Sequence, residues 1–346
     1  MFNSINPGIL SALAAAFLFG MGTPVAKLLL GPADPWLLAG LLYLGSGLGL
    51  ALWRLLRRAG PSHLGSGETK WLAGAILAGG IVAPVLLMWG LSRMPASSAA
   101  LLLNAEGVLT ALLAWFVFHE NFDRRIAAGM AMIVAGAVVL TGSGDAGFDS
   151  VLPPLAVLGA CLGWAIDNNL TRKVALADAA FIAMVKGLAA GTTNVVIAWL
   201  LGATLPSAAV LMSAGAVGFL SYGLSLVLFV VALRHLGTAR TGAYFSTAPF
   251  VGALVAIPLL GESLSMQFMV AAAFMAAGVW LHLTERHEHF HTHEMVEHEH
   301  EHTHDDHHTH AHAEPVTGAH AHRHRHAPLA HSHPHYPDAH HRHHHE

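Results

Sequence analysis

Long apolar runs separated by short polar connections fill the first 284 residues of the chain. The runs cover residues 8–30, 35–57, 71–92, 97–118, 125–142, 152–171, 179–202, 209–232, 238–260 and 265–284. The hydrocarbon core of a bilayer is about 30 Å thick, so a helix needs roughly 20 mostly apolar residues to cross it. Because backbone groups in lipid must be satisfied inside a helix or a closed barrel, the pattern predicts ten transmembrane helices.

Composition separates this apolar body from residues 285–346. The whole chain of 346 residues is 54% apolar and only 11% charged, against about 25% charged residues in an ordinary soluble protein. Yet residues 285–346 hold 24 of the 28 histidines and 11 of the 21 acidic residues. With almost nothing apolar to bury, this tail is predicted to be disordered. The expected fold class is an all-α polytopic membrane protein with a disordered tail, which excludes a soluble enzyme domain.

Lysine and arginine residues in the short connections predict the orientation. If the N-terminus is cytoplasmic, the inner side receives Arg54, Arg57, Arg58, Lys70, Arg124, Arg125, Arg172, Lys173, Arg234, Arg240 and Arg286. The outer side then receives only Lys27 and Arg93. Positive charge favours the cytoplasmic side, so both termini are expected in the cytoplasm and the body in the cell membrane. The basic residues lie at helix ends and form no patch for nucleic acid.

The body also contains an internal duplication. Residues 101–120 align without a gap to residues 243–262, at an offset of 142. The first and sixth apolar runs align at an offset of 145, which matches Phe19 with Trp164, Gly22 with Asp167 and Lys27 with Arg172. Each copy has five helices, an odd number, so the second copy is expected to cross the membrane upside down. The predicted domains are a first repeat (1–142), an inverted second repeat (151–284) and the tail (285–346), an organisation typical of secondary transporters.

A family resemblance rests on the same segments. The segment FSTAPFVGALVAIPLLGESLS, followed by VAAAFMAAGVWL in the next apolar run, resembles the EamA-type permeases of the drug/metabolite transporter superfamily. The resemblance covers residues 8–284 and implies ten helices, two EamA repeats, the cytoplasmic membrane and transport of small molecules without fixing a substrate. One departure stands out: the first repeat has Glu106-Gly107 where the second has Ala248-Pro249.

Glu106 is the deepest acidic residue in the apolar body, about ten residues into the run 97–118, with Asn104 two positions before it. An ionisable side chain at mid-membrane costs at least about 2.5 kcal/mol, so it calls for a role or a partner. One interpretation is a carboxylate that couples transport to a proton or cation. The alternative is a structural acid neutralised by a neighbouring amide or lysine.

Three consecutive polar residues, Asp167, Asn168 and Asn169, lie inside the run 152–171. Successive helical residues point about 100° apart, so at least one of the three should face a cavity, although a cap at the cytoplasmic end is the competing explanation. Lys186 lies at a similar depth on the next run and could pair with Asp167. If substrate or protonation breaks that pair, Lys186 becomes a site for a carboxylate or phosphate; if the pair is permanent, it is scaffold.

A further candidate is the run Gly20-Met21-Gly22-Thr23-Pro24, which is expected to interrupt the first helix. Glycine and proline release backbone groups, and broken helices at a repeat interface mark transport sites. Gly22 and Pro24 are therefore candidate substrate residues, against the simpler interpretation of a proline kink. Tyr222 and Tyr244 are candidate cavity residues, although tyrosine is more often interfacial or packed.

The histidine-rich tail predicts metal binding. Neutral imidazole suits zinc, nickel, cobalt and copper, so a flexible chain of imidazoles would bind them with little selectivity. The candidate ligands are His287, His289, His291, His293, His298, His300, His302, His304, His331, His333 and His335. A solvated tail whose charge follows pH is the alternative.

The function expected from these features is secondary transport of a small polar or amphipathic solute by alternating access, coupled to protons or a cation, with no enzyme activity. Expected partners are membrane lipid, the solute, the coupling ion and a second copy of the chain in a homodimer, but not nucleic acid. Two alternatives are a divalent metal exporter fed by the tail and a membrane-anchored metal buffer or sensor. His282 is the only histidine within the ten apolar runs, and a metal path through the body would be expected to use more of them.

Overall fold

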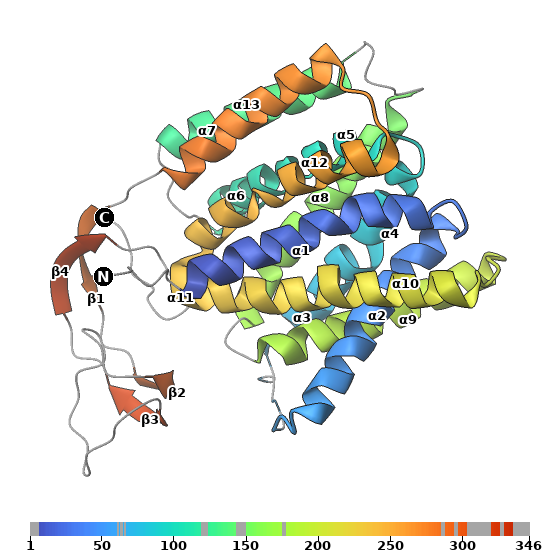
Figure 1. Cartoon of the computed structure of the whole chain (residues 1–346). Helices are drawn as coiled ribbons and strands as arrows, with labels where there is room; N and C mark the ends of the chain where they lie inside the picture. Colours follow the sequence, from blue (N-terminus) through green and yellow to red (C-terminus); the bar gives the residue numbers. More distant parts are fainter. Residues whose placement is uncertain are drawn as a thin grey trace, which may run out of the picture. The chain divides into compact units, whose positions relative to one another are not determined.

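A computed structural model describes residues 7–60, 62, 65, 67–118, 124–142, 150–174 and 178–284 of the body. In the tail it describes 288–293, 297–302, 320–325 and 329–334. The chain divides into two compact units, Met1–Glu285 and Arg286–Glu346. The first unit is a bundle of helices (Figure 1).

Helices make up the described part of the first unit. In chain order they are α1 (Pro7–Leu29), α2 (Pro35–Leu56), α3 (Thr69–Ala75), η1 (Ile76–Val82), α4 (Ala83–Leu91), α5 (Ala96–Leu102), α6 (Asn104–Phe118), α7 (Arg124–Thr141), α8 (Leu152–Thr171), η2 (Arg172–Val174), α9 (Ala179–Leu200), α10 (Ala208–Val217), η3 (Gly218–Leu224), α11 (Ser225–Phe245), α12 (Ala248–Leu260) and α13 (Met266–Leu283). Within the described residues, eight helical stretches are long and apolar enough to cross a membrane, and α12 is a shorter apolar helix. The protein is therefore an all-α polytopic membrane protein, and the count of ten spans stays a prediction.

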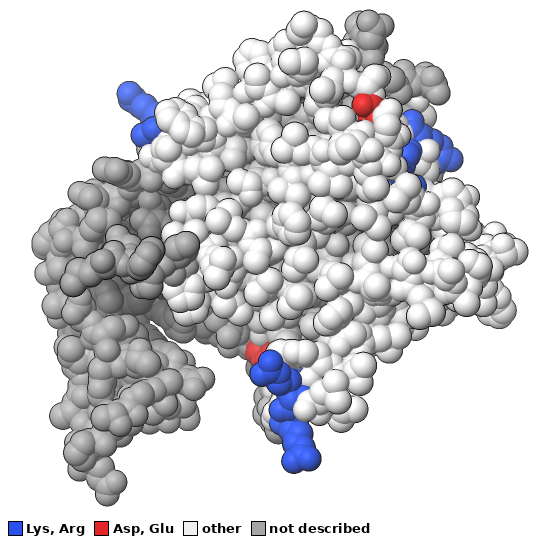
Figure 2. Space-filling model, in the orientation of Figure 1, with Lys and Arg blue, Asp and Glu red and all other residues white. Residues whose placement is uncertain are grey.

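The surface of the first unit fits a lipid environment. The face drawn in Figure 2 is almost free of charged atoms, and Lys and Arg side chains lie at its margins. Large apolar side chains are exposed on many helices, among them Leu55, Phe116 and Trp199, with 74%, 65% and 70% of their surface accessible. Exposed apolar area of this extent marks a surface that another apolar phase covers.

Two π-helical segments, η1 and η3, reproduce the sequence duplication in the backbone. Each is seven residues long, and they begin at Ile76 and Gly218, 142 residues apart. π-Helices are rare and occur mostly as single-turn insertions at functional sites. Two of them at the same offset as the aligned segments 101–120 and 243–262 support a duplicated ancestor.

Helices α2 and α9 begin with equivalent caps. Asp34 caps α2 by accepting from the backbone N–H groups of Trp36 and Leu37, and Asp178 caps α9 by accepting from that of Phe181. Arg54 also donates to Asp178, over 2.5 Å. Partial burial works to raise the pKa of Asp178, but the Phe181 N–H and the Arg54 guanidinium outweigh it and hold the pKa below its ordinary value. The start of α9 is thereby tied to the end of α2.

The same two helices approach each other closely along a line of glycines. A Cβ atom on Gly47 would lie 2.4 Å from the backbone nitrogen of Leu188, and one on Gly191 would lie 2.3 Å from that of Leu44. Small residues let membrane helices pack backbone to backbone. The α2–α9 contact therefore depends on these positions having no side chain.

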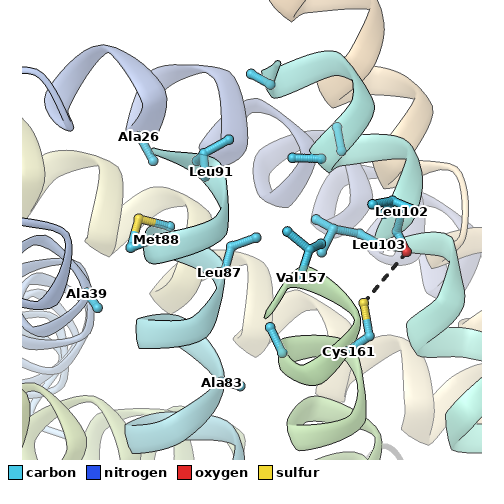
Figure 3. Close-up of a cluster of buried hydrophobic side chains, with 14 of the residues drawn as sticks. Ala26, Ala39, Ala83, Leu87, Met88, Leu91, Leu102, Leu103, Val157 and Cys161 are labelled. Carbon is cyan, nitrogen blue, oxygen red and sulfur yellow. Dashed lines mark hydrogen bonds between the residues drawn. The ribbon is translucent and has the colours of Figure 1, made fainter. Parts of the chain in front are cut away.

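The largest apolar core receives residues from most helices of the body, and Figure 3 shows the part where α4, α5 and α8 meet. Leu87 and Leu91 of α4, Leu102 of α5 and Val157 of α8 are almost completely buried there. The thiol of Cys161 lies 3.6 Å from the backbone oxygen of Leu102. This core fixes α8, which carries the polar residues described below.

Three expected helix boundaries differ in the structure. The connection expected at 233–237 is helical, because α11 continues to Phe245 and the break falls at Ser246–Thr247. Gly237 alone weakens a helix only modestly, whereas Pro249 lies in the first turn of α12, where proline is best tolerated. The run expected at 97–118 is divided at Leu103 into α5 and α6.

The third difference concerns the first helix, since α1 is not interrupted. It runs from Pro7 to Leu29 with Pro24 inside it. Proline is tolerated in membrane helices because neighbouring groups satisfy the backbone that it frees. Gly20 is tightly packed instead: a Cβ there would lie 2.4 Å from the backbone oxygen of Ala248 in α12.

Four described segments of the tail form strands. β1 (Glu288–His293) pairs antiparallel with β4 (Leu329–Pro334), and β2 (Glu297–His302) pairs antiparallel with β3 (His320–Arg325). Alternation of histidine with other residues has the period of two that a strand requires. In the register of β2 and β3, Glu297 is paired with Arg325 and Glu299 with Arg323, and oppositely charged residues at paired positions favour a register.

Candidate functional site

Glu106 lies in the first turn of α6, just after the break at Leu103. It is near the middle of the membrane-crossing stretch Ala96–Val117 and is half-buried. The Asn168 side-chain amide of α8 donates to its Oε1 over 2.8 Å and lies 3.4 Å from the Thr110 hydroxyl. An asparagine from the second half of the chain therefore positions the deepest carboxylate of the first half.

Asp167, the residue before Asn168, forms an ion pair with Lys186. The Lys186 ammonium lies 2.5 Å from Oδ1 and 2.7 Å from Oδ2, and 5% of the lysine side chain and 7% of the aspartate side chain are accessible. The Thr171 hydroxyl donates to Asp167 over 2.7 Å and accepts from Lys186 over 3.2 Å. The pairing expected from their equal depth is thus present, and each charge of the pair has further polar contacts.

Space for this pair depends on the π-helix η1. A Cβ on Gly79 would lie 2.0 Å from Oδ2 of Asp167, so no larger residue fits beside the carboxylate. The Gly79 carbonyl accepts from the Tyr43 hydroxyl over 2.7 Å and from the Trp164 indole over 2.9 Å. The Asn194 amide donates to the next two carbonyls of η1, at 3.3 and 3.2 Å. Side chains of α2, α8 and α9 therefore satisfy the carbonyl groups of η1.

The cluster of Glu106, Asp167 and Lys186 contains two acidic residues and one basic residue. Asp167 and Lys186 neutralise each other, whereas no basic residue in the described part of the chain forms an ion pair with Glu106. One oxygen of Glu106 binds Asn168, and the structure gives the other no hydrogen-bond partner among the described residues. A charged carboxylate at that depth is costly, and a proton or a cationic group that joins it reduces the cost.

Aromatic rings from both halves lie one helical turn from Asn168. Trp164 precedes Asn168 by four residues on α8, and the Phe19 ring meets it edge to face at a centroid distance of 6.0 Å. Phe19 also meets Tyr222 at 5.8 Å, and Tyr222 lies 5.5 Å from Tyr43. The rings of these four residues form what we call the aromatic wall, which is apolar except for the tyrosine hydroxyl and indole N–H groups.

Two other residues predicted for the site, Asn104 and Asn169, form hydrogen bonds away from Glu106. Asn104 does not join Glu106: its amide donates to the Leu101 carbonyl over 2.9 Å and lies 3.8 Å from the Met275 sulfur. Its side-chain oxygen is buried without a partner. Asn169 donates to backbone oxygens of Ala165 and Thr110, at 2.9 and 3.2 Å. All three consecutive polar residues of α8 are therefore engaged with protein.

Gly22, Pro24 and Tyr244 belong to packing contacts. A Cβ on Gly22 would lie 2.9 Å from that of Ser221 in η3, so the glycine admits the π-helix that carries Tyr222. Pro24 is buried inside α1. Tyr244 packs on a separate small cluster of Ala12, Ala232 and Leu236. Of the three, only Gly22 adjoins the aromatic wall.

The predicted metal ligands fall on the tail. His289, His291, His293, His298, His300, His302, His331 and His333 occupy strand positions. His287, His304 and His335 lie outside the described residues. Within the part of the chain whose side chains are described, no three His, Cys, Asp or Glu residues are grouped to hold a metal. His282 in α13 instead contacts the Ile126 carbonyl over 3.1 Å.

Sequence reasoning missed two features of this region. It did not select Asn168 over Asn104 as the partner of Glu106, because the contact between α6 and α8 is not evident in the apolar pattern. It also treated Lys27 and Glu262 only as markers of topology and of the duplication. The aligned offsets, which pair Lys27 with Arg172 and Glu262 with Glu120, were the signal that could have drawn attention to them.

Known proteins resemble this chain along most of its length. A family model for EamA-like transporters matches residues 6–142 and again residues 152–284. The chain is 28% identical over 295 residues to an uncharacterized transporter of Methanothermobacter thermautotrophicus, covering 79% of this chain and 85% of that protein. It is 25% identical over 204 residues to a probable amino-acid metabolite efflux pump of Salmonella typhimurium, covering 55% and 68%. A solved crystal structure with 21% identity has a TM-score of 0.64, covers 80% of this chain and 96% of its own, and shows the same fold.

Apolar helices around a small set of embedded polar residues define a membrane transport protein. Two matched stretches span both halves of the body, and the chain belongs to the EamA-like transporter family.

Proposed function

We propose that this protein is a secondary transporter that moves a small polar or amphipathic solute by alternating access and couples that movement to protons or a cation. The proposal includes two inverted halves, both termini in the cytoplasm and a position in the cell membrane. The equal offset of η1 and η3 supports the duplication, and transporters built from inverted repeats bind their substrates near the midplane. The homodimer stays a prediction.

The observation that carries this proposal is the uncompensated carboxylate of Glu106 at mid-span beside a neutral Asp167–Lys186 pair. A proton or a cationic group can neutralise Glu106, and the two compete for the same oxygen atoms. We therefore propose a solute with a protonated amino group, held by Glu106 and Asn168, with its apolar part against Phe19, Trp164 and Tyr222. The name of the Salmonella relative, an amino-acid metabolite efflux pump, is consistent with such a solute.

Transport in liposomes tests this function. Purified full-length protein is reconstituted, a pH gradient is imposed, and movement of labelled amino acids and glucosamine is compared with that of their N-acetylated forms. We expect transport of at least one amine to follow the pH gradient and its N-acetylated form, which lacks the positive charge, to be moved at least about tenfold more slowly. Equal transport of both forms, or no gradient-dependent transport of any of these amines, contradicts the proposal.

A second candidate activity, metal binding by the tail, is favoured by the register of β2 and β3. His298, His300 and His302 occupy positions opposite His324, His322 and His320. Directly opposed residues of an antiparallel pair have Cβ atoms about 4.5–5.5 Å apart, and imidazole binds zinc, nickel, cobalt and copper. We propose that these opposed histidines bind such an ion on the cytoplasmic side, where the tail buffers metal or regulates the transporter.

Zinc titration of the full-length protein in detergent tests the tail. The variant His322→Ala removes one member of the central opposed pair, and His341→Ala removes a histidine outside the described strands as a matched control. We expect His322→Ala to weaken the tightest zinc-binding class by about tenfold or more and the control to leave it unchanged. Equal affinities of the two variants would show that composition alone governs binding.

A further inference from the structure

Glu262 joins the two halves of the body at the end of α12. It follows Gly261, whose φ of 65° ends that helix in the left-handed region. Its two carboxylate oxygens accept from the backbone N–H groups of Ala96 and Ser97, at 2.6 and 2.9 Å. These N–H groups begin α5 and have no partner within that helix. A carboxylate of the second half thus caps a helix of the first half.

Lys27 holds the other side of the same connection. Its ammonium group donates to the backbone oxygens of Leu91 and Met94, at 2.5 and 3.0 Å. Leu91 ends α4, whose last carbonyl groups lack partners within the helix. The connection between α4 and α5 therefore has a cation from α1 at its beginning. At its end it has a carboxylate from Glu262, two residues after α12.

The two ends of the bundle differ in this respect. Near Glu262, α12 packs closely against α5, and α1 packs against both. By the offset of 142, the counterparts of α12 and α5 are α6 and the last part of α11. The counterpart of the connection 92–95 is 234–237, which is continuous helix within α11. At the end that carries Lys27 and Glu262, α1, α5 and α12 are therefore in mutual contact, and this end is closed.

We propose that Lys27 and Glu262 form a latch that keeps this end of the bundle closed and that must release before a solute can pass there. The inference rests on the proposed transport function, because only alternating access requires this end to open. Hydrogen bonds to a charged partner are stronger than neutral ones, yet the latch consists of only four of them. Loss of either side chain therefore shifts the balance between closed and open forms without removing the apolar core around α4, α5 and α8.

Access of a cysteine reagent to Ser98 tests the latch. Ser98 lies in the first turn of α5, next to Ser97, and only 4% of its surface is accessible. The variant Ser98→Cys is placed on a Cys161→Ala background, so that it carries the single thiol, and is reconstituted in liposomes. We expect Glu262→Gln and Lys27→Met each to raise the rate of labelling by a membrane-impermeant maleimide by about tenfold or more, because each removes charged hydrogen bonds.

The matched control is Arg93→Gln. Arg93 lies on the same connection and is exposed, but its guanidinium contacts only Trp89 and Ser92, so its loss should leave the labelling rate unchanged. Thermal unfolding and size-exclusion profiles of each variant separate opening of the latch from loss of the fold. If folded Glu262→Gln and Lys27→Met proteins label at the same rate as the Ser98→Cys parent, the latch does not exist. Labelling needs no solute, so faster labelling without any amine transport would support the latch and refute the proposed substrate.

Discussion

Replacing Glu106 with glutamine is expected to abolish gradient-driven transport while leaving the protein folded. The amide of glutamine keeps the size of the side chain and an oxygen that can accept from Asn168, but it cannot bind and release a proton. Removing a half-buried charge that has no cationic partner also removes part of a desolvation cost. We therefore expect thermal stability that is equal to or above that of the wild type, together with a loss of transport of at least about a hundredfold.

The measurement is pH-gradient-driven amine transport in liposomes, with unfolding temperature recorded for each preparation. Glu68→Gln is the matched control, because Glu68 accepts from the Gly65 N–H before α3 and lies outside the membrane-crossing stretches. It should retain wild-type transport. Transport by Glu106→Gln that still responds to the pH gradient would remove Glu106 from the coupling mechanism.

Replacing Lys186 with methionine is expected to be the most destabilising single change in the cluster. The substitution leaves the Asp167 carboxylate buried with Thr171 as its remaining side-chain partner. Breaking a buried ion pair from one side costs about 3–5 kcal/mol, whereas replacing both partners with neutral groups costs far less. The double variant Asp167→Asn with Lys186→Met should therefore recover much of the lost stability.

Thermal unfolding of the purified variants in detergent checks this series of single and double substitutions. Lys70→Met serves as control, because Lys70 is exposed at the start of α3 and a change there should have little effect. If Lys186→Met unfolds at the wild-type temperature, the ion pair contributes nothing to stability. If the double variant is as unstable as the single one, the loss comes from packing instead of the unpaired charge.

The membrane-crossing body could be predicted from the sequence because its signal is strong and local. Uninterrupted apolar runs define spans almost independently of tertiary contacts, and a gap-free alignment of two segments reveals a duplication. The contact between Asp167 and Lys186 also followed from depth alone, since a buried charge seeks the opposite charge at its own level. These inferences needed only the distance of each residue from a helix end.

Other features depend on rotation about a helix axis or on tertiary packing, and the sequence did not reveal them. Asn104 and Glu106 are two residues apart on α6 and so point about 200° apart, which places Asn104 near Met275 and Glu106 near a partner on α8. Helix α11 continues past Gly237 where a connection was expected. The π-helices change which residues face a neighbour, so the contact of Gly79 with Asp167 was not evident from spacing. In such helices, a shift of one residue changes which neighbouring residue a side chain contacts.

Phe19 and Trp164 occupy equivalent positions of the two halves, at the offset of 145, and their rings touch. For two copies related by the proposed twofold axis, equivalent residues can meet only close to that axis. The Phe19–Trp164 contact therefore lies in the interface between the two halves, so a smaller side chain at either position would loosen the packing of both halves together.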